Sequence, residues 1–195
     1  MVKKFTQAII EQYLNNYDKK YYLRELSSLL KKPHQTIKPY VESLVKDGIL
    51  IKNKRKKIVE YNLNFKDNRV YDYLIISEKE KLIDRLREDA LLRVLFEKLS
   101  PLFNKATIVI FGSTAVRTSK DSDIDLLVIG KQNMSKIIED FESVYNKKIH
   151  KIQIGDVKNL TLTFIKEVYK KHLIFNNTEL VVRLFGELYE QNKLV

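Results

Sequence analysis

The sequence predicts an α+β fold in two domains, a mainly helical N-terminal domain followed by an α/β domain with a mixed sheet. Three observations lead to this class. Apolar residues recur at helical spacing over residues 5–46, and two shorter apolar runs with strand character follow within residues 49–63. Two further apolar runs of strand length, 108–111 and 124–129, enclose a polar stretch. The chain between these two groups is charged and helical in pattern.

The positive charge of the chain is concentrated near its N-terminus. The 195 residues have a formal net charge of +11. Residues 1–66 contain 15 Lys and Arg against 6 Asp and Glu, whereas residues 67–195 contain 21 against 19. A concentrated basic segment is typical of proteins that bind nucleic acid.

The composition also excludes some classes of protein. There is no cysteine, so disulfides and thiolate metal sites are excluded, and this fits a reducing cytosol. No apolar run approaches the roughly 18–20 residues of a membrane span, and residues 1–10 lack the apolar core of a secretory signal. We therefore expect a soluble, cytoplasmic protein that has no membrane partner.

Residues 108–129 contain the candidate residues for binding phosphate and a metal ion. Its first apolar run ends on Gly112-Ser113, nine mostly polar residues follow, and the second run carries Asp123 and Asp125 at alternate positions. Glycine lets the backbone approach a ligand, and a serine at a helix start offers a hydroxyl and an amide where phosphate is attracted. Side chains two apart in a strand share a face, so the two carboxylates project together and suit Mg²⁺.

This pattern matches the signature of the DNA polymerase β nucleotidyltransferase superfamily. The fuller run Phe-Gly-Ser-x-Ala-x-Arg, together with Ser-Asp-Ile-Asp-Leu-Leu-Val, resembles its minimal nucleotidyltransferases, which are prokaryotic; we expect the archaeal type. The resemblance implies transfer of a nucleoside monophosphate from an NTP, with ATP expected, in the presence of Mg²⁺. It implies that Asp123 and Asp125 are catalytic and hold the metal. It also implies that Gly112, Ser113 and Arg117 bind the nucleotide.

A third carboxylate normally follows in this superfamily, on the strand after the next helix, where it completes the metal site and serves as general base. Here that strand is expected at 149–154 and contains no acid; the expected position falls near Lys151 or Gln153. Asp156, just past the strand, is the acid that could reach inward. His150 has no partner at metal-ligand spacing, which favours an ordinary surface or core role. Loss of a general base typically lowers the rate by a factor of about 10² to 10⁴, so the sequence does not decide whether the domain is catalytically active.

The rest of the second domain is expected to be helical apart from this strand. Helices are predicted at 134–145, 161–172 and 178–192 from their apolar spacing. His172, at the end of the second of these, is also expected to have an ordinary surface or core role.

The N-terminal third resembles a winged helix-turn-helix domain. Amphipathic helices are expected at 5–14, 23–30 and 34–46, followed by a hairpin of strands 49–52 and 58–63 with a basic tip. The run from the third helix into the first hairpin strand is similar to the recognition helix and first wing strand of that family. The family implies double-stranded DNA as the partner, although winged helices also serve as protein interaction modules.

Two groups of DNA-contacting residues follow from this resemblance. The start of the third helix would face the major groove, where glutamine can pair with adenine. The hairpin tip would lie on backbone phosphate or in the minor groove. The first group is His34, Gln35, Thr36 and Lys38, and the second is Lys54, Arg55, Lys56 and Lys57.

A charged helical stretch at 68–100, with a break expected near Asp89, joins the two domains. Its apolar stripe either packs on the following domain or forms a dimer interface, and core packing is favoured. The predicted boundaries are 1–65 for a winged helix-turn-helix DNA-binding domain, 66–103 for a helical connector and 104–195 for a nucleotidyltransferase domain.

Two functions are compatible with the sequence. In the first, the protein transfers a nucleoside monophosphate to a hydroxyl of a protein, an RNA end or a small molecule. Minimal nucleotidyltransferases of this type often act as antitoxins that adenylylate a helical toxin, and the N-terminal domain would bind the promoter. In the second, the protein is a DNA-binding transcriptional regulator whose impaired nucleotidyltransferase domain is a nucleotide sensor or scaffold. A homodimer, the habit of winged-helix proteins, is expected in either case.

Overall fold

The structure is a computed structural model that describes residues 2–55, 58–119 and 122–194. Its secondary structure is mixed, with helices and two sheets, in agreement with the predicted α+β class. None of the described helices combines the length and the apolar character that a membrane span requires.

The chain forms two compact units. The first unit consists of Met1–Glu80 and Val182–Val195, and the second consists of Lys81–Val181. The domain boundaries expected after residues 65 and 103 stay a prediction, because a compact unit is not by itself a domain that folds alone.

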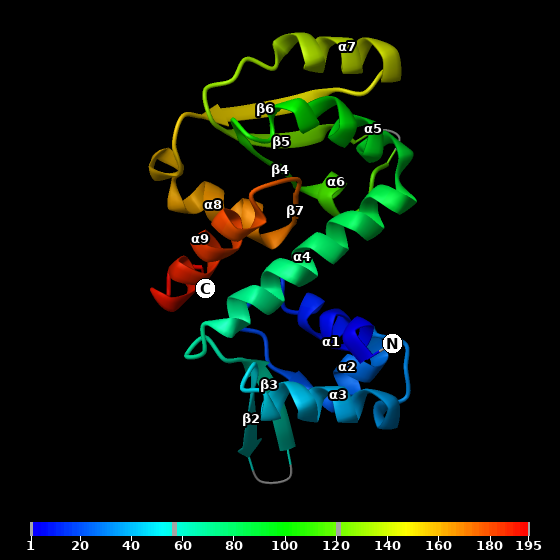
Figure 1. Cartoon of the computed structure of the whole chain (residues 1–195), viewed down its shortest axis with the longest axis vertical. Helices are drawn as coiled ribbons and strands as arrows, with labels where there is room; N and C mark the ends of the chain where they lie inside the picture. The colour runs from blue at the N-terminus through cyan, green and yellow to red at the C-terminus, as the bar shows by residue number, and fades with distance from the viewer. Residues whose placement is uncertain (1, 56–57, 120–121, 195) are drawn as a thin grey trace. The chain divides into compact units, whose positions relative to one another are not determined.

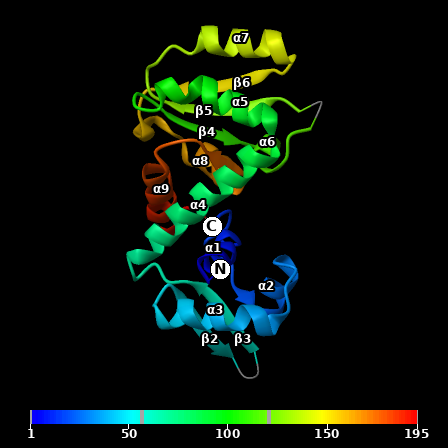
Figure 2. The ribbon, with the colours of Figure 1, turned by 45° about the vertical axis from the view of Figure 1, so that its right-hand side comes forward.

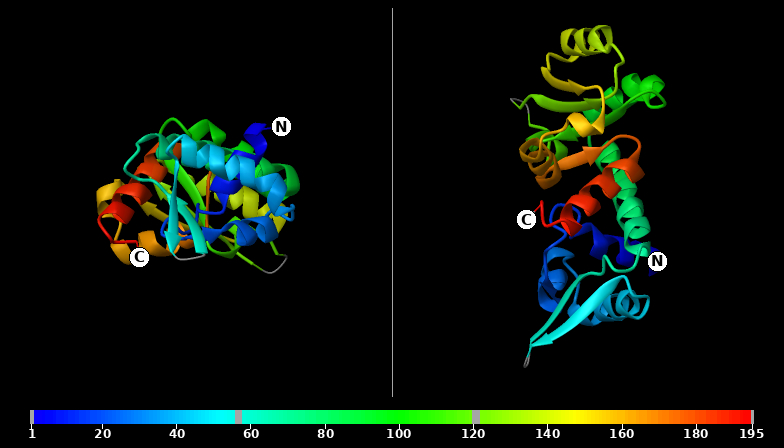
Figure 3. Two further views of the ribbon diagram at one scale, coloured as in Figure 1. Left: turned by 90° about the horizontal axis from the view of Figure 1, so that it is seen from below. Right: turned by 90° about the vertical axis from the view of Figure 1, so that its left-hand side faces the viewer.

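Three helices and a three-stranded antiparallel sheet make up the N-terminal part of the first unit (Figure 1). The strand order is β1-β3-β2. Helix α3 lies beside the hairpin of β2 and β3 (Figures 2 and 3). The elements are α1 (Val2–Glu11), β1 (Tyr21–Tyr22), α2 (Leu23–Leu29), α3 (His34–Lys46), β2 (Leu50–Arg55) and β3 (Ile58–Leu63).

The predicted amphipathic helices form the core of this part. Helix α3 has the predicted bounds, and the apolar positions at its helical spacing are fully buried: Ile37, Val41 and Leu44. The hairpin differs from the prediction at its tip. Because the ladder with β3 extends to the pair Arg55 and Ile58, residues 53–55 belong to strand β2 and not to a turn.

The long charged stretch is broken where the sequence indicates. Helix α4 (Arg69–Glu88) ends and α5 (Ala90–Leu99) begins on either side of Asp89, whose side chain accepts a hydrogen bond of 3.0 Å from the backbone N–H of Leu92. The break therefore has a local cause, because an aspartate at this position caps the new helix.

A four-stranded mixed sheet in the order β6-β5-β4-β7 organises the second unit (Figure 1). Strands β5 and β6 are parallel, and the other two pairs are antiparallel. The predicted helix 161–172 ends early, and His172 begins a strand. The elements after α5 are η1 (Ser100–Leu102), β4 (Thr107–Phe111), α6 (Ser113–Val116), β5 (Ile124–Ile129), α7 (Ser135–Tyr145), β6 (Ile149–Ile154), η2 (Val157–Asn159), α8 (Leu162–Lys170), β7 (His172–Ile174) and α9 (Thr178–Glu190), whose last turns belong to the first unit.

The two faces of this sheet are different. One face packs against α5 and α7 and forms the core, with Ile124, Leu126 and Val128 of β5 fully buried. Side chains alternate along a strand, so Asp125 projects from the opposite face. On that face α8 lies over β4, where the rings of Phe111 and Phe164 meet edge to face at 5.3 Å. The core side therefore fixes the strands that carry the predicted site.

Candidate active site

The turn after β4 brings the predicted phosphate-binding residues to the edge of the sheet. Gly112 has φ +72° and ψ −151°, a conformation that glycine adopts readily, and its N–H donates to the carbonyl of Lys171 at 3.0 Å. Ser113 is exposed and begins α6, which has only four residues. A helix this short has a weak dipole, so local amides and the serine hydroxyl are the groups available to phosphate.

The two sequence motifs meet directly. Phe111, the residue before Gly112, is paired with Asp125 across β4 and β5. A Cβ atom built on Gly112 would lie 2.7 Å from Oδ2 of Asp125, which is closer than a real side chain could stand. The backbone of the Gly-Ser turn therefore lies against one of the two predicted metal-binding carboxylates.

Asp123 directly precedes β5 and Asp125 is its second residue, and their side chains are 42% and 35% exposed respectively. Between and after them, Ile124 and Leu126 point into the core, as the alternation predicts. Burial, and to a lesser extent the negative charge of Asp123, raise the pKa of Asp125; the nearby imidazole of His150 acts in the opposite direction. The pair is thus a site of concentrated negative charge.

The structure places His150 beside these carboxylates. In the parallel register of β5 and β6, His150 is opposite Asp125. Its Nε2 lies 3.5 Å from Oδ2 of Asp123, and its Nδ1 lies 3.7 Å from Oδ1 of Asp125. His150 thus lies beside the carboxylate pair with an exposed side chain. An ordinary role for His150, and a third-carboxylate position near Lys151 or Gln153, both stay predictions.

The other residues considered on this strand lie elsewhere. The Nζ of Lys151 donates to Gln153, whose own amide donates to the carbonyls of Gly130 and Gln132. The carboxylate of Asp156 accepts from the N–H of Lys158 and caps η2, so it does not complete the metal site. His172 is buried, and its Nδ1 lies 2.9 Å from the carbonyl of Tyr169, in agreement with a core role.

Two further predictions can be placed on the same unit. Arg117 follows α6 in extended backbone, is exposed, and has no ion-pair partner among the described residues. In the same described ranges, no three His, Cys, Asp or Glu side chains are arranged to hold a metal ion together. Asp123 and Asp125 are therefore a pair of carboxylates and not a complete metal cage.

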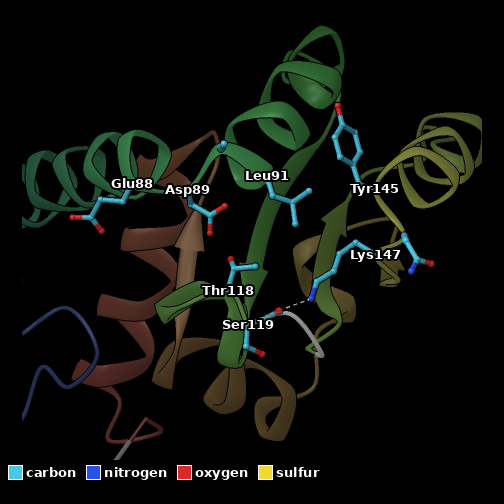
Figure 4. A pocket seen from close by; sticks show the side chains of 9 residues that line it. Glu88, Asp89, Leu91, Thr118, Ser119, Tyr145 and Lys147 are labelled. Atoms are coloured by element: carbon cyan, nitrogen blue, oxygen red, sulfur yellow. Dashed lines mark hydrogen bonds between the residues drawn. The ribbon is translucent and has the colours of Figure 1, made fainter.

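Three supporting residues were not found from the sequence. The buried hydroxyl of Thr114 donates to the carbonyl of Asp123 at 2.8 Å and also meets Ser122 at 3.4 Å. The buried Lys147 donates from Nζ to the carbonyl of Ser119 at 2.7 Å (Figure 4). These bonds fix both ends of the loop between α6 and β5. Thr114 and Ser122 lie inside the two motifs, but their bonds to distant parts of the chain could not be predicted from the spacing.

A pocket of about 580 Å³ lies beside this loop, and Figure 4 shows the side chains around it. Asp89, which caps helix α5, belongs to this lining. Burial raises its pKa, but the hydrogen bond from the N–H of Leu92 and the charge of Arg85 contribute to a net lowering. None of the four predicted nucleotide or metal residues of the Gly-Ser and Asp-x-Asp motifs lines it. The lining residues are Glu88, Asp89, Ala90, Leu91, Thr118, Ser119, Tyr145, Asn146 and Lys147.

The predicted DNA-contacting residues belong to the first unit. His34, Gln35, Thr36 and Lys38 are all exposed and lie in the first turns of α3. Lys54 is exposed on β2, and the backbone of Arg55 ends that strand. The two remaining members of this group, Lys56 and Lys57, lie outside the described residues.

Comparison with known protein families agrees with the geometry of the second unit. Residues 97–180 match the family model described as polymerase beta, nucleotidyltransferase. This segment therefore resembles a polymerase β nucleotidyltransferase domain. The match includes the Gly-Ser turn, both aspartates and His150, and it ends in the first turn of the last helix, α9. It does not include α1 to α4.

Other comparisons add little to this assignment. No curated protein matches the chain. A solved structure, that of Pseudomonas aeruginosa HmgR, matches over 79% of this chain and 52% of its own, with 14% sequence identity and a TM-score of 0.30. The chain thus spans about half the length of that protein, and a TM-score of this size does not indicate a shared fold.

Proposed function

We propose that the nucleotidyltransferase domain transfers a nucleoside monophosphate from an NTP, with ATP as the expected donor, to a hydroxyl acceptor. The observation that carries this proposal is the contact of Gly112 with Asp125. It brings a backbone turn suited to phosphate against a carboxylate suited to a cation, at one edge of the sheet. The proposed acceptors are a protein hydroxyl, as in an antitoxin that modifies a toxin, an RNA end or a small molecule.

The donor set fits Mg²⁺. This ion typically takes one or two carboxylates and completes its shell with water and substrate phosphate oxygens. Asp123 and Asp125 supply two such groups, and a cation between them would offset the repulsion of their adjacent negative charges. When bound, the metal would offset charge on the phosphates and the leaving pyrophosphate.

The chain's own residues have separate roles in this proposal. Gly112 leaves room for the phosphates beside the carboxylates, and Ser113 offers its hydroxyl and amide. Arg117, exposed just after α6, is available to a phosphate oxygen through its planar guanidinium. Thr114 and the loop bonds hold Asp123 in place.

Calorimetric titration tests this function. ATP with Mg²⁺ is titrated into the wild type and into Asp123→Asn/Asp125→Asn. The control Glu139→Gln/Asp140→Asn removes the same charge from the exposed face of α7. We expect the wild type and the control to bind ATP only with Mg²⁺ and the first variant not to bind. If the wild type binds as expected, label transfer from the α-phosphate of ATP then compares the three acceptor classes. If the wild type does not bind, the domain is a scaffold.

We further propose that the first unit is a winged helix-turn-helix that binds double-stranded DNA. The exposed residues at the start of α3, the adjacent hairpin and the concentrated positive charge of residues 1–66 support this. A DNA partner is consistent with a cytoplasmic protein, and the lack of cysteine suits that compartment.

A second candidate function is favoured by His150. If an imidazole in place of the third carboxylate abolishes catalysis, the protein is a DNA-binding regulator whose nucleotidyltransferase domain senses a nucleotide. Measurement of DNA affinity with and without ATP and Mg²⁺ distinguishes the two functions, because a sensor must change its affinity for DNA when the nucleotide binds. In an enzyme that binds DNA independently of its nucleotide, the DNA affinity would not change when ATP and Mg²⁺ are added.

A further inference from the structure

Arg85, in the last turn of α4, connects the end of this helix to the turn that carries Gly112 and Ser113. Its Nη2 lies 3.3 Å from Oδ2 of Asp89 and 3.3 Å from the carbonyl oxygen of Thr114, and it donates a hydrogen bond to each. Only 15% of the Arg85 side chain is exposed. The guanidinium therefore lies inside the second unit, between the α4–α5 junction and α6.

The carbonyl of Thr114 needs a donor from outside its own helix. Helix α6 has only four residues, and the last carbonyls of any helix have no partner within it. The carbonyl of Ser113 accepts from the N–H of Arg117 at 3.0 Å, whereas the carbonyl of Thr114 accepts from Arg85. Because so short a helix is not stable on its own, external bonds of this kind determine where α6 lies.

Thr114 is also bonded to Asp123. Its hydroxyl donates to the Asp123 carbonyl at 2.8 Å, and the residue is fully buried. Its carbonyl is held by Arg85 and its side chain holds Asp123, so one residue joins the two. Ser113, the candidate phosphate-binding residue, directly precedes it in the chain. A continuous series of hydrogen bonds therefore runs from Asp89 through Arg85 and Thr114 to Asp123.

Stability alone does not account for an arginine at this position. Its Nε is buried and has no hydrogen-bond partner among the described residues. A buried donor without an acceptor costs free energy, and each such group calls for an explanation. Asp89 does not need the arginine in order to cap α5, because its Oδ1 accepts from the N–H of Leu92. The bond to Thr114 is the one that connects Arg85 to the candidate active site.

We propose that Arg85 is a positioning residue of the nucleotidyltransferase site, which fixes Asp123 through Thr114 and thereby supports binding of the nucleotide with Mg²⁺. The inference rests on the proposed function in taking Asp123 as a ligand of the cation. Residues that orient metal ligands without touching the metal typically contribute 10- to 100-fold to metal affinity. Loss of the Arg85 contact should therefore weaken binding of ATP with Mg²⁺ by at least about tenfold.

Calorimetric titration of ATP with Mg²⁺ into the full chain tests this. The variants are Arg85→Met, Thr114→Val and the two together, and the control Arg87→Gln changes an exposed arginine in the same turn of α4. We expect the control to bind as the wild type does. The double variant should bind no more weakly than the weaker single variant, because both substitutions break the same connection. Two unrelated structural effects would instead add in free energy.

A second substitution covers the case in which Arg85→Met does not fold. Arg85→Lys keeps the positive charge beside Asp89, but the shorter lysine side chain lacks the planar guanidinium and does not reach both acceptors. Its affinity for ATP with Mg²⁺ should also fall by about tenfold. Wild-type affinity in either Arg85 variant overturns the proposal, and so do additive effects of Arg85→Met and Thr114→Val.

Hydrogen exchange in the absence of ATP separates this inference from the proposed function. The N–H of Arg117 bonds within α6, and that of Gly130, at the other end of β5, bonds to the carbonyl of Ile154 at 2.7 Å. Arg85→Met should speed exchange of the Arg117 amide by about tenfold, the size expected for one hydrogen bond from a charged group, and leave Gly130 unchanged. If this occurs but the wild type does not bind ATP, the proposed function fails and the contact of Arg85 with α6 stands. Unchanged exchange at Arg117 overturns the inference even if the wild type binds ATP.

Discussion

The backbone of Gly112 lies against the carboxylate of Asp125, so closely that a Cβ atom on Gly112 would stand 2.7 Å from Oδ2. Thirteen positions separate these residues in the sequence, and the antiparallel pairing of β4 with β5 brings them together. The positive φ of Gly112 also requires a residue without a side chain. The glycine of the motif thus serves two purposes, a turn conformation and space beside a carboxylate.

Substitution of Gly112 by alanine should affect both stability and binding. A strained left-handed conformation costs about 1–3 kcal/mol, so urea unfolding of Gly112→Ala should show a loss of this size. The displaced Asp125 should reduce ATP affinity in the presence of Mg²⁺ by at least about tenfold, or 1.4 kcal/mol. Gly155→Ala is the control, because a Cβ there is in ordinary contact at 3.6 Å with Lys131. Equal effects of the two substitutions would contradict the role of Gly112.

The sequence was informative about this site because its signals are local. Glycine before serine, and aspartates two apart in an apolar strand, each follow from backbone geometry that a short stretch determines. The proximity of His150 to the carboxylates could not be predicted, because it depends on the register between β5 and β6, which are separated by α7. The observed pairing puts His150 opposite Asp125.

The helices and strands show the same distinction. Helix α3 and the break at Asp89 were predicted because periodicity and a capping aspartate are visible in the sequence. Strand β7 was not predicted, and its first residue, His172, was assigned to the end of the helix 161–172. Such a short strand is recognised only from its pairing with β4. Where a short apolar run fits both a helix and a strand, its tertiary pairing determines which of the two it forms.

The raised pKa of Asp125 predicts a pH-dependent gain from Asp125→Asn. A carboxyl group whose pKa is higher in the folded state destabilises the folded protein when ionised. This penalty is absent below the ordinary pKa of 3.8 and is fully present above the folded pKa. In metal-free buffer we expect Asp125→Asn to raise Tm at neutral pH, with the gain disappearing in acid. Asp140→Asn, an exposed control, should show no such trend. A lower Tm for Asp125→Asn at neutral pH would refute the prediction.

Thr114 should be required for the position of Asp123. Its hydroxyl is buried and donates to the Asp123 carbonyl at 2.8 Å, and valine has the same shape without the donor. An unsatisfied buried carbonyl costs about 1–3 kcal/mol, so Thr114→Val should lose that much unfolding free energy and bind ATP more weakly. Thr114→Ser keeps the hydroxyl and should restore ATP binding. Thr163→Val, on an exposed position of α8, should change neither quantity. Unchanged ATP affinity in Thr114→Val would show that this hydrogen bond is not required for ATP binding.

The proposed DNA contacts of the hairpin predict a salt dependence of binding. Each phosphate contact releases condensed counterions, so the logarithm of affinity falls with the logarithm of salt concentration by about 0.9 per contact. Lys54→Glu/Arg55→Glu removes two contacts and should flatten the slope by about 2 for any duplex sequence. The control Lys79→Glu changes an exposed lysine of α4 and should leave the slope unchanged. Equal slopes for the hairpin variant and the wild type would exclude the hairpin from the interface and leave α3 as the sole proposed contact.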